Sequence, residues 1–204
     1  MWALVESNNV TQVYTRPKAL TIENVNYPSN IFTMWSASEL EAIGIYEVVQ
    51  DGTNYKDPKY YINTNQSFAF GSGKVTATYG TATAKAIADT LYTAQDETDG
   101  FGTEGEVKSK GLKTLHKEVI NSGAASKLSP TDWMVVRAAE GGTAVPSSIT
   151  TQRAAVRTKA NAMCTQIDNA ANVDALATLY AYVNTGTEDS PVYERPLGEL
   201  PTVG

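Results

Sequence analysis

The chain has few of the residues on which many enzymes and metal proteins depend. Its 204 residues include one cysteine, Cys164, and one histidine, His116. A single cysteine excludes an intrachain disulfide, and the two residues together cannot supply the four ligands of a structural zinc site. Catalysis by a cysteine–histidine pair would require Cys164 and His116 to meet, and the sequence around neither residue indicates this.

The chain also lacks a surplus of positive charge and a long hydrophobic run. Sixteen Lys and Arg residues against 22 Asp and Glu residues give a net charge of −6, which opposes binding to nucleic acid or to anionic lipid. No window of about 20 apolar residues is present that would span a membrane. The first residues lack the basic start and the apolar stretch of a signal peptide, so we expect synthesis in the cytoplasm without export.

Motifs of catalysis are equally scarce. The sequence contains neither a glycine-rich phosphate loop nor a Gly-x-Ser-x-Gly elbow. A calcium loop begun at Asp96 would place Phe101 at the glycine position and Val107 at the position of the bidentate glutamate, so a flexible acidic linker is favoured over calcium binding. A pair of glycosidase carboxylates stays open, because such residues converge in space rather than in sequence. We predict a non-enzymatic protein with no cofactor, no metal and no catalytic residue.

Composition changes along the chain and predicts an α+β fold. Residues up to 79 are rich in Tyr, Asn, Thr, Val and Ile, whereas residues 81–182 are rich in Ala, Lys, Glu, Gln and Leu. The first set favours strands and the second favours helices. We therefore predict a small β-rich N-terminal domain over 1–80, a helix and acidic linker over 81–105, a helical module over 106–183, and an extended C-terminal tail over 184–204.

Local signals define the elements of the N-terminal part. Residues 1–5 and 10–14 read as a hairpin joined by residues that tolerate positive φ. Ser36 and Glu39 have capping-box spacing, which predicts a helix over 38–43 that ends at Gly44. Strands are predicted over 45–49, 60–62, 67–70 and 74–79, and the last two should pair across a glycine-rich turn.

Helices are predicted over 81–95, 107–122, 131–140, 149–170 and 173–182. In the second, Leu112, Leu115 and Val119 should share one apolar face, and His116 should be a partly exposed structural residue. Trp133 in the third is expected to pack on the fourth. That fourth helix has an apolar seam, which either packs within its own bundle or faces a partner, the first being favoured; the seam residues are Ile149, Val156, Ala160, Met163 and Ile167.

Three arginines should cluster near the start of that long helix. Arg153 and Arg157 are four residues apart, and Arg137 lies in the preceding helix. The simplest interpretation is a bundle stabilised by salt bridges to Glu140 or Asp132.

Two groups of segments resemble phage proteins. Residues 19–22, 27–36 and 40–46 are similar to the opening of small virion-associated proteins of tailed bacteriophages, especially marine ones. Residues 131–137 (Thr-Asp-Trp-Met-Val-Val-Arg), 145–146, 153–157 (Arg-Ala-Ala-Val-Arg) and 195–198 (Arg-Pro-Leu-Gly) resemble the C-terminal helical module of tail-fibre assembly proteins and related tail proteins. Residues 81–105 have no counterpart in this resemblance.

The resemblance implies a protein that binds a tail fibre or the baseplate, as a structural component or as a fibre-assembly chaperone. Its partners would be other phage tail proteins, in a symmetric assembly that contains several copies of this chain, and its location would be the virion tail. The alternative is a tail component that contacts the receptor or degrades cell-wall glycan. Contact residues are expected among amphipathic tyrosines and in the tail, namely Tyr46, Tyr60, Tyr61, Val192, Tyr193 and Leu197.

Overall fold

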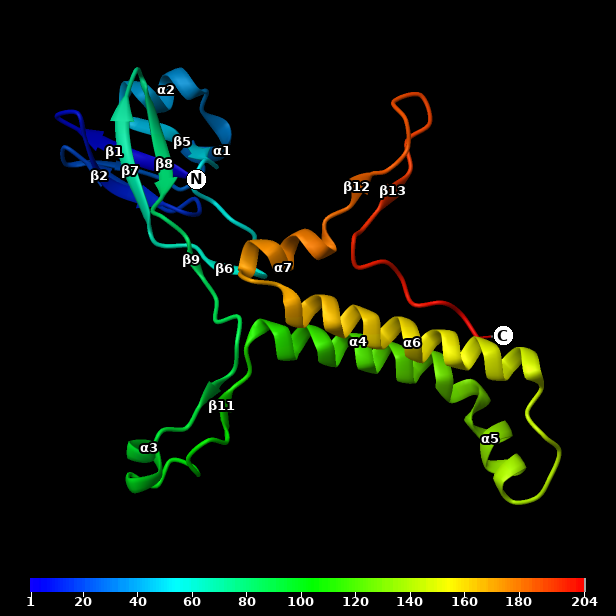
Figure 1. The fold of residues 1–204 in the computed structure, drawn as a ribbon. Coiled ribbons are helices and arrows are strands. Elements are labelled where there is room, and N and C mark those ends of the chain that lie inside the picture. Colours follow the sequence, from blue (N-terminus) through cyan, green and yellow to red (C-terminus); the bar gives the residue numbers. More distant parts are fainter. Residues whose placement is uncertain (204) are drawn as a thin grey trace. The chain divides into compact units, whose positions relative to one another are not determined.

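The computed structural model describes residues 1–203 and divides the chain into two compact units, with the boundary in the sequence between Thr83 and Ala84. The first unit is built around a β-sheet and the second is mainly helical (Figure 1). The predicted α+β class is therefore confirmed. Within the described residues, each helix is too short or too polar to cross a bilayer.

The first unit begins with the expected hairpin. Strand β1 (Trp2–Glu6) pairs antiparallel with β2 (Asn9–Tyr14). The connecting residues Ser7 and Asn8 have φ angles of 50° and 64°. Two consecutive positive φ values are typical of the turn whose twist matches a β-hairpin, so local turn chemistry sets this register.

A five-stranded sheet organises the unit in the order β2-β1-β5-β8-β7. Strand β5 (Ile45–Asp51) runs parallel to β8 (Lys74–Tyr79), and β8 pairs antiparallel with β7 (Gln66–Gly71). Alternation along β1 directs Ala3 and Leu4 into different apolar clusters. The sheet is therefore packed on both faces.

Two short helices cover the cluster that contains Leu4. They are α1 (Ile31–Met34) and α2 (Ala37–Ala42). The Ser36 backbone N–H donates to Glu39 Oε2 at 2.7 Å and the Glu39 N–H donates to Ser36 Oγ at 3.4 Å, which is the predicted capping box. Gly44 follows with a φ of 79°, as expected for a left-handed helix end.

Two small strand pairs are also present. Strand β3 (Leu20–Ile22) pairs with β4 (Val25–Tyr27), and β6 (Tyr61–Ile62) pairs with β9 (Thr83–Ala84). The two residues of β9 lie on either side of the unit boundary. Neither α1 nor the β3–β4 hairpin was expected from the sequence.

The predicted helix over 81–95 is wrong. That stretch contains β9 and β10 (Thr90–Leu91), followed by the five-residue helix α3 (Ala94–Thr98), and β10 pairs with β11 (Val107–Ser109). The backbone of this stretch makes tertiary hydrogen bonds, and these outweigh the helix propensity of its alanines. The carbonyl oxygens of Ala86 and Ile87 accept from Leu112 N and Lys113 N at 2.9 and 3.0 Å, so they satisfy the exposed amides at the start of α4 (Leu112–Leu128).

Asp89 completes the cap of α4 from the same extended segment. Its carboxylate accepts from Gly111 N at 2.7 Å and from the Thr114 hydroxyl at 3.0 Å. These bonds hold the pKa of Asp89 below its usual value, the Gly111 backbone bond being the largest cause. Gly111 itself has no room for a side chain, because a Cβ there would lie 2.2 Å from Ala88 O.

Helices α4 and α6 (Ser147–Asn169) lie side by side as the main body of the second unit (Figure 1). The predicted seam is largely confirmed, because Val156, Ala160, Met163 and Ile167 are all buried. The buried residues of α4 are Leu112, His116, Ile120 and Ala124.

The predicted face of α4 was therefore wrong at two of its three residues. Leu115 and Val119 are exposed, whereas His116 is buried and its ring centroid lies 4.6 Å from that of Tyr180. The buried residues of α4 are spaced strictly four apart. The prediction selected the most apolar side chains instead and so identified the wrong face. His116 is structural, as expected, but it is not partly exposed.

Helix α5 (Asp132–Ala139) follows a short 3-10 turn, η1 (Ser129–Thr131). Trp133 was expected to be buried and is instead 54% exposed, with the Arg137 guanidinium 4.8 Å from its ring centroid. No residue of α5 is buried. This helix therefore does not insert its indole into the seam.

Arg153 lies within the seam of α6 and fixes the start of α5. Its Nη1 donates to Leu128 O at 2.7 Å and to Thr131 Oγ1 at 2.6 Å, and its Nη2 donates to Asp132 Oδ1 at 2.7 Å. The expected salt bridge to Asp132 is thus confirmed. Arg157 lines a small cavity together with Arg153, whereas Arg137 stacks on Trp133, so the three arginines do not act as one cluster.

The C-terminal region is not simply an extended tail. After α7 (Val173–Tyr180), strand β12 (Val183–Asn184) pairs with β13 (Tyr193–Glu194) to form a hairpin. The following residues return to the helices: Leu197 N donates to Leu179 O at 3.0 Å, and Leu200 packs beside Gly123 of α4. Intrachain contacts therefore order this segment.

Candidate functional site

The tyrosines proposed as contact residues in the first unit are mostly unavailable. Tyr60 and Tyr61 are buried, at 5% and 8% exposure. Tyr46 is partly buried and packs against Phe70, with ring centroids 4.6 Å apart. These tyrosines pack within the first unit, so they are poor candidates for a partner surface.

The proposed contact residues of the C-terminal region divide into two kinds. Leu197 is fully buried within its own chain, so the expectation that it docks on a neighbour is wrong. Val192 and Tyr193 are 49% and 64% exposed in and beside β13. The hairpin formed by β12 and β13 is therefore the place where the sequence-derived contact residues are accessible, and we call it the C-terminal hairpin.

The register of the C-terminal hairpin gives it two distinct faces. Val183 lies opposite Glu194, and Asn184 lies opposite Tyr193. Side chains alternate along a strand, and directly opposed residues share a face. One face therefore carries Val183, Val192 and Glu194, with Thr185 N donating to Val192 O at 2.7 Å. We call it the valine face.

The opposite face is aromatic and polar. Continuing the alternation by one residue places Tyr182 and Arg195 with Tyr193 and Asn184. Tyr182 and Tyr193 are then diagonal neighbours across the two strands, a relationship within reach of aromatic side chains. We call this the tyrosine face. Tyr182 was not among the contact residues predicted from the sequence. The available signal was its position just before β12, which pairs with β13 across a turn-rich stretch.

A network at the base of the hairpin positions the tyrosine face. Arg195 donates from Nε to Gly198 O at 3.0 Å and from Nη2 to Glu199 Oε2 at 2.6 Å. The other carboxylate oxygen of Glu199 accepts from the Tyr182 hydroxyl at 3.3 Å. Gly198 N in turn donates to Arg195 O at 2.8 Å, which closes a turn with Pro196 at its second position.

A cavity of about 490 Å³ opens at this base. This volume falls in the range of small-molecule sites, which extends from about 300 to 1,000 Å³. Its lining includes both exposed tyrosines and the residues of the network: Tyr182, Tyr193, Glu194, Arg195, Pro196, Gly198 and Glu199. The arrangement offers aromatic surface together with fixed hydrogen-bonding groups.

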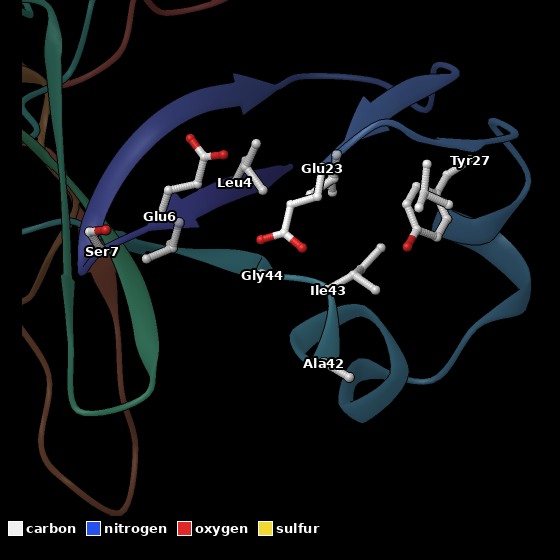
Figure 2. Close-up of a pocket in the computed structure, with 11 residues that line it drawn as sticks. Leu4, Glu6, Ser7, Glu23, Tyr27, Ala42, Ile43 and Gly44 are labelled. Atoms are coloured by element: carbon white, nitrogen blue, oxygen red, sulfur yellow. The ribbon is translucent and has the colours of Figure 1, made fainter.

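A second groove lies in the first unit, between β1, the β3–β4 hairpin and the end of α2. It has a volume of about 570 Å³. Figure 2 shows Glu6 and Glu23 extending into this open space from different elements, near Leu4 and Ile43. Both glutamates are exposed. Two acidic residues, which the glycan-degrading alternative requires, therefore line one groove, in a strongly solvated setting.

The remaining candidates for chemistry have structural partners. Burial raises the pKa of the Cys164 thiol, which disfavours the nucleophilic thiolate. The carboxylate of Asp96, considered as a calcium ligand, accepts from Lys108 Nζ at 2.6 Å and from Thr93 N at 2.9 Å. Across residues 1–203, no group of three or more His, Cys, Asp and Glu side chains is arranged to hold a metal ion.

Comparisons with known proteins return no relative: no family model, no curated protein and no solved structure matches this chain. The functional argument therefore rests on the residues, on the geometry of the two units and on the resemblance described above.

Proposed function

We propose that this chain is a non-enzymatic protein of a bacteriophage tail, which binds another tail protein of the fibre or baseplate through the valine face of its C-terminal hairpin. The resemblance over residues 131–157 and 195–198 supports the phage assignment. The hairpin supports the binding role, because it leaves Val183 and Val192 exposed as diagonal neighbours on one face of a two-stranded ribbon.

That exposure is the observation on which the proposal depends. An isolated two-stranded ribbon is marginally stable in water, and exposed apolar side chains beside unpaired strand edges are typical of surfaces that become covered. Strand addition to such an edge combines backbone hydrogen bonds with apolar side-chain contacts. A partner that covers the valine face would supply both.

Other apolar side chains of the second unit are also exposed. They lie on α4, on α5 and in the segment between α3 and β11: Phe101, Leu115, Val119, Trp133 and Val136. The ordered C-terminal segment no longer argues for neighbouring copies, because Leu197 is held by Leu179 of the same chain. Assembly of several copies and residence in the mature virion stay predictions.

The alternative is a receptor-contacting or glycan-degrading tail component, and the groove with Glu6 and Glu23 is what favours it. A glycosidase needs one carboxyl group in an apolar environment that keeps it protonated near neutral pH. Both glutamates here are exposed to solvent. We therefore favour binding over hydrolysis. Glycan hydrolysis that is lost in Glu6→Gln and Glu23→Gln variants would reverse this preference.

Mass spectrometry of purified virions and of tail-assembly intermediates tests the proposal. A structural component will appear in virions at a fixed ratio to other tail proteins, and an assembly factor will appear only in the intermediates. Absence of the chain from both fractions would contradict a tail function.

A further inference from the structure

We propose that the tyrosine face of the C-terminal hairpin is a binding site for a neutral saccharide, distinct from the valine face that we assign to a protein partner. The inference concerns the cavity of about 490 Å³ lined by Tyr182, Tyr193 and the Arg195–Glu199 pair. It goes beyond the proposed tail function and does not depend on it.

The chemistry of the lining separates a saccharide from a protein partner. Pyranose rings have a face of C–H groups that packs on an aromatic ring, and a rim of hydroxyl groups that needs both donors and acceptors. The cavity contains two exposed tyrosines and no aliphatic side chain other than Pro196. The valines of the hairpin lie on its opposite face, which is better suited than the cavity to an apolar contact with a protein.

The two tyrosines have different roles in this site. Tyr193 is 64% exposed, so its ring is the available stacking surface. Tyr182 is 63% exposed, but its hydroxyl is anchored on Glu199 at 3.3 Å, which restricts the direction of its ring. A ring fixed before the ligand arrives loses little conformational freedom on binding.

The polar groups are also positioned before binding. Arg195 is held by Gly198 O at 3.0 Å and by Glu199 at 2.6 Å, and its Nη1 takes part in neither bond. Glu199 remains largely exposed, with 65% of its side chain accessible. A guanidinium that donates and a carboxylate that accepts can bind neighbouring hydroxyl groups of one sugar ring.

Charge decides the kind of saccharide. Glu194 borders the cavity together with Glu199, although its register places it on the valine face, and Arg195 is already paired with Glu199. A phosphorylated or sulfated ligand would meet this negative charge on a chain whose net charge is −6. The site therefore fits an uncharged sugar.

The test uses the purified full chain and saturation-transfer NMR with methyl glycosides of glucose, galactose, mannose and N-acetylglucosamine. Glycerol is the control, because it has hydroxyl groups without a ring face. We expect transfer to the ring C–H protons of at least one glycoside, with a dissociation constant near 1 mM, as is reasonable for a ligand of this size. Glycerol should show no transfer.

Variants assign the binding to this face. Tyr193→Ala should weaken binding by about tenfold, whereas Tyr193→Phe, which keeps the ring, should change it by less than about twofold. Tyr55→Ala removes a comparably exposed tyrosine of the first unit and should have no effect. Circular dichroism of each variant verifies folding. Tyr193 is 64% exposed, so Tyr193→Ala removes no buried side chain.

The proposal is overturned if none of the glycosides receives saturation, or if the transfer persists unchanged in Tyr193→Ala. It is also overturned if a proline-rich peptide binds this face while the sugars do not. Each of these results would leave the valine face and the tail function untouched, because Val183 and Val192 lie on the other side of the ribbon.

Discussion

Arg153 of α6 donates to Asp132 at the start of α5 across 2.7 Å, and it does so from a position inside the apolar seam between the two long helices. The same guanidinium also satisfies Leu128 O and the Thr131 hydroxyl where α4 ends. One side chain therefore ties together the end of α4, the 3-10 turn and the start of α5, and the orientation of that corner depends on it.

Replacing Arg153 tests this corner. Arg153→Met keeps much of the apolar stem but removes the donor to the Leu128 carbonyl, the Thr131 hydroxyl and Asp132, so that the Leu128 carbonyl keeps only the Thr131 hydroxyl as a side-chain donor. This change should lower the free energy of unfolding by about 1–3 kcal/mol. Urea denaturation measures the loss. Arg157→Met is the matched control on an exposed position of the same helix, and its effect should stay within about 0.5 kcal/mol. Equal losses in the two variants would contradict the role of Arg153.

Leu197 should behave as a core residue of the second unit. Leu197→Ala removes a fully buried side chain and should destabilise the unit by about 2–5 kcal/mol. Leu91→Ala, at an exposed strand position, is the control and should change stability little. Thermal unfolding followed by circular dichroism compares them. A near-neutral Leu197→Ala would indicate that the C-terminal segment is only loosely attached.

Gly111 should tolerate no side chain. A Cβ at this position would meet Ala88 O at 2.2 Å, so Gly111→Ala must displace the segment that caps α4. We expect a loss of about 1–3 kcal/mol in the free energy of unfolding. Gly52→Ala is the control, since no atom lies within 4 Å of its Cβ position. Similar stabilities for the two variants would show that the cap is not required.

Asp96 should titrate unusually low. Hydrogen bonding to Lys108, followed by bonds from Thr93, lowers the pKa of its carboxyl to about 2 from 3.8. Because the folded-state pKa is depressed, its stabilising effect is present above pH 3.8 and is lost as the pH falls through about 2. Carbon-13 NMR of the carboxyl group follows this titration. Lys108→Met should raise the midpoint toward 3.8, and an unchanged midpoint would contradict the Lys108 bond as its main cause.

Features determined by neighbouring residues were predictable from the sequence. The capping box of Ser36 and Glu39, the hairpin turn at Ser7 and Asn8, and the seam from Val156 to Ile167 each follow from residues within a few positions of one another. The structure reproduces all three.

Features determined by distant residues were not predictable in this way. The stretch 81–95 has good helix propensity, yet Ala86, Ile87 and Asp89 are not helical, because their oxygen atoms cap α4 more than 20 residues later. Composition likewise marked Tyr60 and Tyr61 as surface residues although packing buries them. The candidate site was found in part: Val192 and Tyr193 were expected, whereas Tyr182 joined them only through the strand pairing of the hairpin.

The most direct measurement for the proposed function is the amount of this chain in purified tails when the valine face carries a charge. Val192→Asp places a carboxylate where a partner would bury it, which is strongly unfavourable without a compensating charge. Val25→Asp, at 50% exposure on β4, is the matched control for the 49% exposed Val192. The account predicts at least about tenfold less Val192→Asp protein in tails or tail intermediates, with Val25→Asp at the wild-type level. Normal incorporation of a folded Val192→Asp chain would contradict it.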